Sequence, residues 1–367
     1  METKNRHHPK EENKITKKDL LTYYFELKEQ INRINKALKL SKEELPEYYE
    51  KLRKIDDMND KKRSFIGFKK AIHPLIYSAI VLTRLSRNQN LIIINKEQWK
   101  NYNKTPIIYT FTHVGRYDVE IITETIKKSY CLIAGDPESM YRTSDGFAMV
   151  LNGVEYVNTD SKTDRKVCFN NMVRNLKQGM SIVLAPEGIW NASKLLKNSC
   201  KPCLDIYAGA VDAAFITECD IAPIGLEQYN NQFITYIGEP LSIKAYKYGY
   251  ESQEQAKKAA TIELRDRLAT AKWNVWEYKK ELDGLAKRKD IPNNYWNDYV
   301  DTRISEWKDK EGNLYYNEDI IERRIYKRKD IIDEDEVFDF INNKLKIKEN
   351  NSFILRSHYN KYEKNKR

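Results

Sequence analysis

A histidine and an aspartate, His113 and Asp118, follow directly after the apolar segment Ile107–Phe111. That segment has the length of a strand, so the pair falls where a strand gives way to a turn. A histidine can take a proton from a hydroxyl near neutral pH, and a carboxylate on its other ring nitrogen would fix its tautomer. Gly115 gives the intervening turn conformational freedom. The spacing predicts general-base chemistry, although Asp118 can also be read as the N-cap of a following helix.

A second strand-to-turn segment follows at Ile182–Gly188 and ends in Ala185-Pro186-Glu187-Gly188. A Pro-Glu-Gly sequence on its own is an ordinary turn. The carboxyl ends of parallel strands meet at one edge of a sheet, so Glu187 is expected to face the same edge as His113. A carboxylate there can accept hydrogen bonds from a hydroxyl-bearing substrate or from an arginine.

The alternation of short apolar runs with amphipathic stretches from residue 89 to residue 246 predicts an α/β domain with a mostly parallel sheet and flanking helices. We expect a disordered basic tail at 1–16, a helical region at 17–88 and a charged helical extension at 247–367. The expected strands are Leu91–Ile94, Ile107–Phe111, Cys131–Ala134, Tyr156–Val157, Ser181–Ala185, Ile221–Ile224 and Phe233–Ile237. The expected helices of the domain are Val119–Lys128, Asp164–Lys177 and Asp205–Thr217, with a long helix at Glu254–Glu281 after it.

The charge balance favours anionic partners. The 367 residues hold 64 Lys plus Arg against 54 Asp plus Glu, a formal net charge of +10. Nucleic acid, anionic lipid headgroups and phosphorylated substrates are all compatible with that excess, and so is a merely well-solvated surface. Basic and acidic residues are interspersed and no nucleic-acid-binding signature appears, so we expect no nucleic-acid partner.

The cysteines do not predict a metal site. Cys200 and Cys203 have a zinc-like spacing, but no second Cys-x-x-Cys pair or histidine cluster completes a ligand set. We therefore expect no metal. The polar N-terminus shows no signal peptide, which favours a reducing, cytoplasmic location.

One apolar segment, 72–82, is too short to span a bilayer. Basic residues flank it, at Lys69, Lys70, Arg84 and Arg87 among others. Such a segment can lie in a membrane interface, and it can equally be a buried helix with basic ends.

Four sequence blocks, in order, resemble the glycerolipid acyltransferase family, which includes the lysophosphatidic acid acyltransferases. The resemblance covers about residues 90–245. The blocks are His113 to Asp118, Gly153-Val154-Glu155-Tyr156-Val157, Pro186-Glu187-Gly188 and Ile221-Ala222-Pro223-Ile224. The resemblance implies direct acyl transfer from a thioester to a glycerolipid hydroxyl in phospholipid synthesis, with no covalent enzyme intermediate.

The resemblance also assigns roles. It implies that His113 is the base, that Asp118 orients it, and that Arg116, Arg165, Glu187 and Gly188 contact substrate. The donor would be acyl-CoA or an acyl-carrier protein, used as a co-substrate without any bound cofactor. The acceptor would be a lysophosphatidate-type lipid, and the protein would be peripheral to the inner face of the membrane.

Two departures from the family pattern keep the acceptor open. Thr159, or Asn158 if the register is shifted by one residue, stands where the family has an arginine, and Ile189-Trp190-Asn191 replaces its Thr-Arg-Ser. These family residues are associated with the acceptor's phosphate; Arg165, Arg116 and Lys194 are cations that can compensate. The alternatives are the same chemistry on a non-phosphate hydroxyl and a non-enzymatic nucleic-acid-binding protein.

Overall fold

A computed structural model describes residues 16–41, 43–58, 66–102, 106–115, 117–135, 148–149, 151–159, 161–188, 203 and 206–284. The strands are β1 (Asn90–Ile94), β2 (Ile108–Phe111), β3 (Tyr130–Ala134), β4 (Val154–Tyr156), β5 (Ser181–Leu184), β6 (Ile221–Tyr229) and β7 (Gln232–Ile237). The helices are α1 (Lys17–Ala37), α2 (Leu45–Met58), α3 (Ile66–Ser86), the 3-10 helix η1 (Lys96–Asn101), α4 (Asp118–Ile126), α7 (Lys162–Lys177), α8 (Gly209–Thr217), α9 (Ile243–Lys247) and α10 (Gln253–Leu282).

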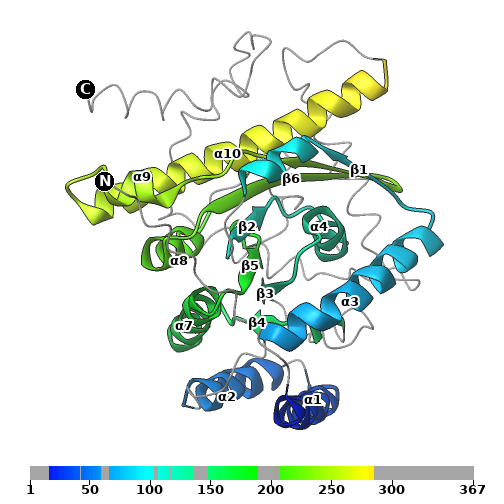
Figure 1. Ribbon diagram of the computed structural model, residues 1–367, viewed down its shortest axis with the longest axis vertical. Coiled ribbons are helices and arrows are strands. Elements are labelled where there is room, and N and C mark those ends of the chain that lie inside the picture. The colour runs from blue at the N-terminus through cyan, green and yellow to red at the C-terminus, as the bar shows by residue number, and fades with distance from the viewer. Residues whose placement is uncertain are drawn as a thin grey trace, which may run out of the picture.

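The seven strands form one sheet in the order β1-β7-β6-β2-β5-β3-β4. Every neighbouring pair is parallel except β6 and β7, which are antiparallel. Helices cover both faces of the sheet (Figure 1). The predicted α/β class with a mostly parallel sheet is confirmed.

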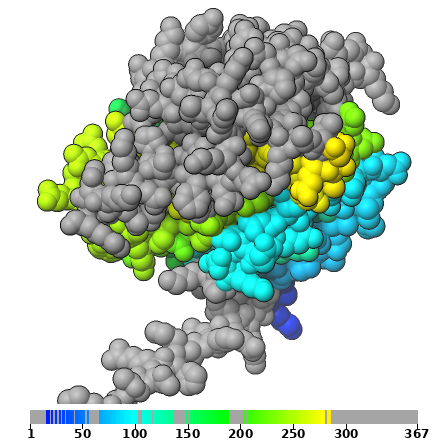
Figure 2. Space-filling model, turned by 90° about the horizontal axis from the view of Figure 1, so that it is seen from above, coloured from blue at the N-terminus to red at the C-terminus, as the bar shows by residue number. Residues whose placement is uncertain are grey.

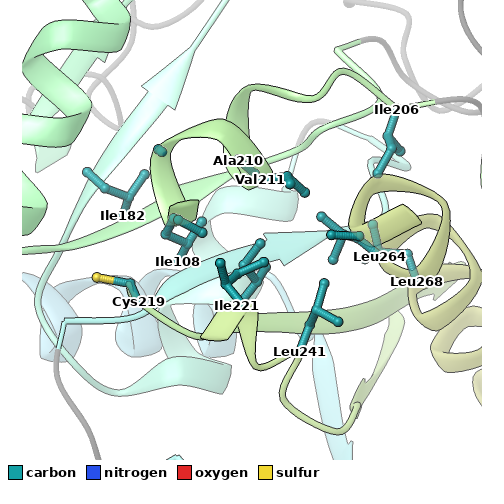
Figure 3. Close-up of a cluster of buried hydrophobic side chains, with 14 of the residues drawn as sticks. Ile108, Ile182, Ile206, Ala210, Val211, Cys219, Ile221, Leu241, Leu264 and Leu268 are labelled. Atoms are coloured by element: carbon teal, nitrogen blue, oxygen red, sulfur yellow. The ribbon is translucent and has the colours of Figure 1, made fainter. Parts of the chain in front are cut away.

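Adjacent residues along the central strands enter two different cores, because side chains alternate across a strand. Ile108, Ile182 and Ile221 face α7, α8, α9 and α10, as Figure 3 shows for the α8 and α10 side. Their neighbours Tyr109 and Val183 face α3 and α4. Burial on both faces explains why these strands read as continuous apolar runs in the sequence.

Strand β6 is longer than predicted, and the chain reverses direction after it. The sequence predicted a strand ending at Ile224, but β6 continues to Tyr229 and pairs antiparallel with β7. The turn between them contains Asn230 with φ 50°, a left-handed conformation that asparagine tolerates. The reversal places β7 between β6 and β1, so β1 joins the sheet only through β7.

Helix α10 packs directly on β6 and β7. A Cβ added to Gly225 would lie 2.3 Å from the backbone carbon of Ala271, so the helix and strand backbones meet there. Lys272 Nζ lies 2.8 Å from Glu227 Oε2, and Trp276 Nε1 donates to the same oxygen at 3.1 Å. This buried pair fixes α10 on the sheet. Helix α10 lies within the predicted C-terminal extension, and residues beyond 284 lie outside the described part of the chain. The domain boundaries therefore stay a prediction.

The N-terminal helices lie at the opposite end of the molecule from α10 (Figure 1). Helix α2 contacts α7, and its Tyr49 ring lies 5.7 Å from the Tyr156 ring of β4. Helix α1 meets α2 near its own C-terminal end, where Tyr48 donates to the carbonyl of Arg33 at 3.4 Å. Within the described residues, no helix is both long enough and apolar enough to cross a membrane; the predicted basic tail falls almost wholly outside them.

Candidate active site

The end of β2 is fixed to β6 before the motif begins. Thr112 is fully buried, and its hydroxyl donates to the carbonyl of Leu226 at 3.2 Å and accepts from the Leu226 N–H at 2.9 Å. Its own N–H donates to the carbonyl of Ile224 at 3.2 Å. His113 therefore leaves the sheet from a rigid point.

His113 and Asp118 lie within hydrogen-bond distance. Nδ1 of the histidine is 2.7 Å from Oδ2 of the aspartate. The same oxygen accepts the backbone N–H groups of Val114, at 2.6 Å, and Gly115, at 3.0 Å. Three donors converge on one carboxylate oxygen, so the side chain of Asp118 is tied to the turn that precedes its helix.

This geometry fixes the role of each ring nitrogen. Because Oδ2 is an acceptor, Nδ1 of His113 carries a proton, and Nε2 is then the ring nitrogen that can take one. The His113 side chain is 24% exposed and the Asp118 side chain 1%. The pair therefore combines a buried orienting carboxylate with a ring that substrate can reach.

Helix α4 carries the aspartate and begins at it. Ile121, Ile122 and Ile126 of α4 are buried against the sheet. A carboxylate in the first turn is also favoured by the partial positive charge at a helix N-terminus. The apolar face of α4 thus anchors the helix while its first residue points back to the histidine.

Glu187 follows β5, the strand beside β2. The pairing of Ile108 with Ile182 sets an offset of 74 residues, and the same offset relates His113 to Glu187. The Glu187 side chain is fully buried, and its Oε1 accepts the backbone N–H of His113 at 3.0 Å. Glu187 therefore holds the main chain of the histidine.

The turn that carries Glu187 is closed by a hydrogen bond from Gly188 N to the carbonyl of Ala185, at 3.1 Å. Gly188 has φ +69°, and a Cβ there would lie 2.8 Å from the ring of Tyr207. Tyr207 N donates to the carbonyl of Pro186 at 2.9 Å, and its side chain is 42% exposed. Both the backbone conformation and the neighbouring aromatic ring therefore disfavour a side chain at this position.

Arg165 lies close to Thr159, one of the two positions at which the sequence resemblance predicts an arginine. The guanidinium of Arg165 donates to the carbonyl of Thr159. Arg165 is in the first turn of α7, which Ser161 caps by accepting the N–H of Asp164 at 3.2 Å. A cation thus stands beside Thr159, on the exposed surface of the helix.

Several predicted site residues cannot be placed. Arg116, Trp190 and Lys194 lie outside the described residues, as does Cys200. In the described part of the chain, no group of three or more His, Cys, Asp or Glu side chains could hold a metal ion.

Sequence reasoning missed Thr112 and Tyr207. Thr112 directly precedes the histidine, but nothing in its type indicates the bonds to β6. Tyr207 is separated from Gly188 by eighteen residues, and no spacing signal links them.

The site described above lies within a part of the chain that resembles known proteins. Residues 90–227 match the family model described as Acyltransferase. Among solved structures, the chain is similar to the 1-acyl-sn-glycerophosphate (LPA) acyltransferase PlsC from Thermotoga maritima, at 15% identity. That similarity covers 71% of this chain and 95% of the other, with a TM-score of 0.42. No curated protein matches the chain.

Proposed function

Because residues 90–227 match the family model described as Acyltransferase, we propose that the protein moves a fatty acyl group from an acyl thioester to a hydroxyl of a glycerolipid of the lysophosphatidate type. The 2.7 Å contact between His113 Nδ1 and Asp118 Oδ2, at the carboxyl end of β2, carries the proposal. In this reading the reaction belongs to phospholipid synthesis.

His113 acts as the general base. Its Nε2 takes the proton of the acceptor hydroxyl as the hydroxyl oxygen attacks the thioester carbonyl carbon. The carbon–sulfur bond then breaks, and the thiolate leaves with the proton that the imidazolium returns. Asp118 stabilises the imidazolium while it exists.

The backbone N–H groups at 113, 114 and 115 do not serve the reacting carbonyl. They donate to Glu187 and Asp118, so charge on the carbonyl oxygen must be stabilised by other donors. Glu187 contributes by accepting the backbone N–H of His113, and Gly188 contributes by adopting the turn conformation that orients the Glu187 side chain.

The donor is acyl-CoA or an acyl-carrier protein, both anionic and both suited to a chain of net charge +10. The reaction needs no bound cofactor. The choice between the two donors is tested directly by supplying each with the same acyl chain.

The activity test uses the full chain with an acyl thioester and lysophosphatidate, following free thiol release and diacylated product by mass spectrometry. His113→Ala is expected to lower turnover at least about a thousandfold, because base and proton carrier are both lost. Lys128→Ala, in an exposed position just after α4, is the matched control and should retain full activity. Retained transfer in His113→Ala, with an unchanged circular dichroism spectrum, would sink the mechanism.

For the acceptor, we propose that Arg165, with Arg116, contacts the phosphate. Support comes from the guanidinium of Arg165 beside Thr159, the position at which the family has its own arginine. The replacement of family cations at Thr159 and Trp190 favours a second candidate, the same transfer to a hydroxyl without a phosphate.

The two candidates separate on matched acceptors. Lysophosphatidate and monoacylglycerol present the same hydroxyl with and without the phosphate. If Arg165 binds phosphate, Arg165→Ala should lower kcat/KM for lysophosphatidate about tenfold or more and leave monoacylglycerol unchanged. Lys166→Ala, exposed on the same helix, is the control. A wild-type preference for monoacylglycerol would favour the second candidate.

We also propose that α3 docks on a membrane surface, where a lipid acceptor would be found. Leu75, Leu82 and Leu85 of α3 are 71%, 66% and 53% exposed, and Lys70 is exposed near its start. The α3 segment and the following β1–η1 segment, blue to cyan, form part of the surface seen in Figure 2. Exposed leucines beside basic residues suit the boundary between headgroups and acyl chains.

The docking test is flotation with anionic vesicles. Replacing Leu75 and Leu82 together by aspartate should weaken vesicle binding roughly hundredfold, since each leucine contributes about 1–2 kcal/mol when removed from water. Leu282→Asp, at the exposed end of α10, is the matched control. Equal binding of the double variant and the wild type would count against docking by α3.

A further inference from the structure

Arg87, the residue that follows α3, contacts the first turn of α4, the helix that carries Asp118. Arg87 Nη1 lies 3.0 Å and 2.9 Å from the two carboxylate oxygens of Glu120. Its guanidinium carbon is 4.9 Å from the ring centroid of Tyr117, and that ring and the Phe233 ring are T-shaped with centroids 6.1 Å apart. Arg87 thus contacts the residue before Asp118 and the second residue after it.

A second pair joins the same helices one turn further along. Arg84 Nε donates to Glu124 Oε1 at 2.7 Å, and Arg84 also donates to the carbonyl of Gln89 at 2.5 Å. The Glu124 and Glu120 side chains are 5% and 7% exposed, so both pairs hold nearly buried carboxylates. The two pairs have similar chemistry, but only the first flanks Asp118.

The geometry of Asp118 makes its placement demanding. Its Oδ2 serves His113 Nδ1 and two backbone N–H groups, all within 2.6 to 3.0 Å. All three donors belong to the turn, whereas the carboxylate belongs to α4. A shift of about half an ångström between turn and helix would take these bonds beyond their useful range.

We infer that Arg87 is a positioning residue: through Glu120 and Tyr117 it sets the first turn of α4, and so holds Asp118 in register with His113. The inference rests on the proposed function and deepens it, because it makes the residue after α3, the helix proposed to dock on a membrane, part of the support for the catalytic pair. Arg84 binds Glu124, one turn further along α4, and has no such role.

The Arg87 side chain is 28% exposed, so only the carboxylate of its pair is nearly buried, and ion pairs of this kind are not required for stability as such. Replacing both partners by apolar side chains is often neutral, whereas removing one partner leaves a buried charge. Replacing both members of a pair together therefore separates the effect on folding from the effect on the position of Asp118. Arg87→Leu with Glu120→Leu tests the first pair, and Arg84→Leu with Glu124→Leu is its matched control.

The expected results differ between the two pairs. The Arg87/Glu120 exchange should lower kcat between about tenfold and about a hundredfold with KM changed less than about threefold, as a misplaced catalytic group would. The Arg84/Glu124 exchange should leave kcat within about threefold. Thermal unfolding of both variants checks that each one folds.

A second readout does not depend on turnover. The proton shared by His113 Nδ1 and Asp118 should give a downfield N–H resonance, assigned by its loss in His113→Ala. The Arg87/Glu120 exchange should broaden or abolish that resonance, and the Arg84/Glu124 exchange should leave it. Arg87→Lys keeps a charge near Glu120 but loses the planar group over Tyr117, so its effect should be intermediate.

The inference is overturned if both exchanges lower kcat equally, or if the resonance survives the Arg87/Glu120 exchange unchanged with full activity. A wild-type protein that transfers no acyl group but shows the resonance, lost in the Arg87/Glu120 exchange alone, would refute the proposed function and leave the positioning intact.

Discussion

Replacing Asp118 by asparagine separates the charge of the carboxylate from its hydrogen-bonding geometry. Two backbone N–H groups, of Val114 and Gly115, donate to the Oδ2 position at 2.6 and 3.0 Å. An asparagine is therefore expected to place its oxygen there and its amide nitrogen in place of Oδ1, which is buried and accepts no hydrogen bond from the described residues. The asparagine oxygen still accepts from Nδ1 of His113, so the tautomer is kept.

What the variant loses is the attraction between the carboxylate and the imidazolium. Two unit charges about 4 Å apart interact by about 4 kcal/mol at the effective dielectric near a protein surface. The His113 ring is 24% exposed, so solvent screening reduces this to roughly 2–4 kcal/mol. Asp118→Asn should therefore lower kcat about thirtyfold to about a thousandfold.

The assay is thiol release at saturating donor and acceptor, with the diacylated product confirmed by mass spectrometry. Asp118→Ala is the comparison, because it also leaves the Val114 and Gly115 N–H groups without their acceptor and should lower both activity and melting temperature further. Asp118→Asn activity within threefold of the wild type would refute the electrostatic role. A loss equal to that of Asp118→Ala would refute the claim that geometry is retained.

Two further substitutions test the surroundings of the site and the fold. Gly188→Ala should lower stability by about 1–3 kcal/mol, because φ +69° disfavours a side chain and the new Cβ would lie 2.8 Å from the Tyr207 ring; a double variant with Tyr207→Ala should recover part of the loss in a urea titration. Hydrogen bonds from Lys247 and Tyr248 lower the pKa of Glu218 from 4.5 to about 2, so the ionised form stabilises the fold above about pH 4.5 and that contribution falls as the pH drops toward 2. The stability difference between the wild type and Glu218→Gln should therefore shrink between about pH 6 and about pH 3, and a constant difference would contradict the assignment.

Most strands could be predicted because burial on both faces makes them short apolar runs bounded by turns. The hairpin between β6 and β7 was harder, because its turn is a pair of asparagines with no glycine, and β6 continues beyond Ile224 through Gly225 and Glu227. Neither residue type favours a strand. They are tolerated there because α10 covers them, with its backbone against Gly225 and with Lys272 against Glu227.

The candidate site could be predicted only as far as local spacing reaches. The reach from His113 to Asp118 is set within one turn, so the sequence indicated it. The bond from His113 N to Glu187 depends on β5 lying beside β2, and strand order is not encoded in local periodicity. Arg87 was interpreted as a basic flank of an apolar segment; its partner Glu120 lies 33 residues away and could be assigned only in three dimensions.

Because β7 lies between β6 and β1, the part of the chain that must fold together is longer than the segment that matches the family model. The family match ends at residue 227, inside β6, yet β7 is the strand that joins β6 to β1. A fragment cut at that boundary would leave β1 without a neighbour, open β6 as an unpaired edge and uncover Gly225, all of which favour aggregation. The smallest piece expected to fold with His113 and Asp118 in place therefore extends at least through α10, well past the residues that match the family model.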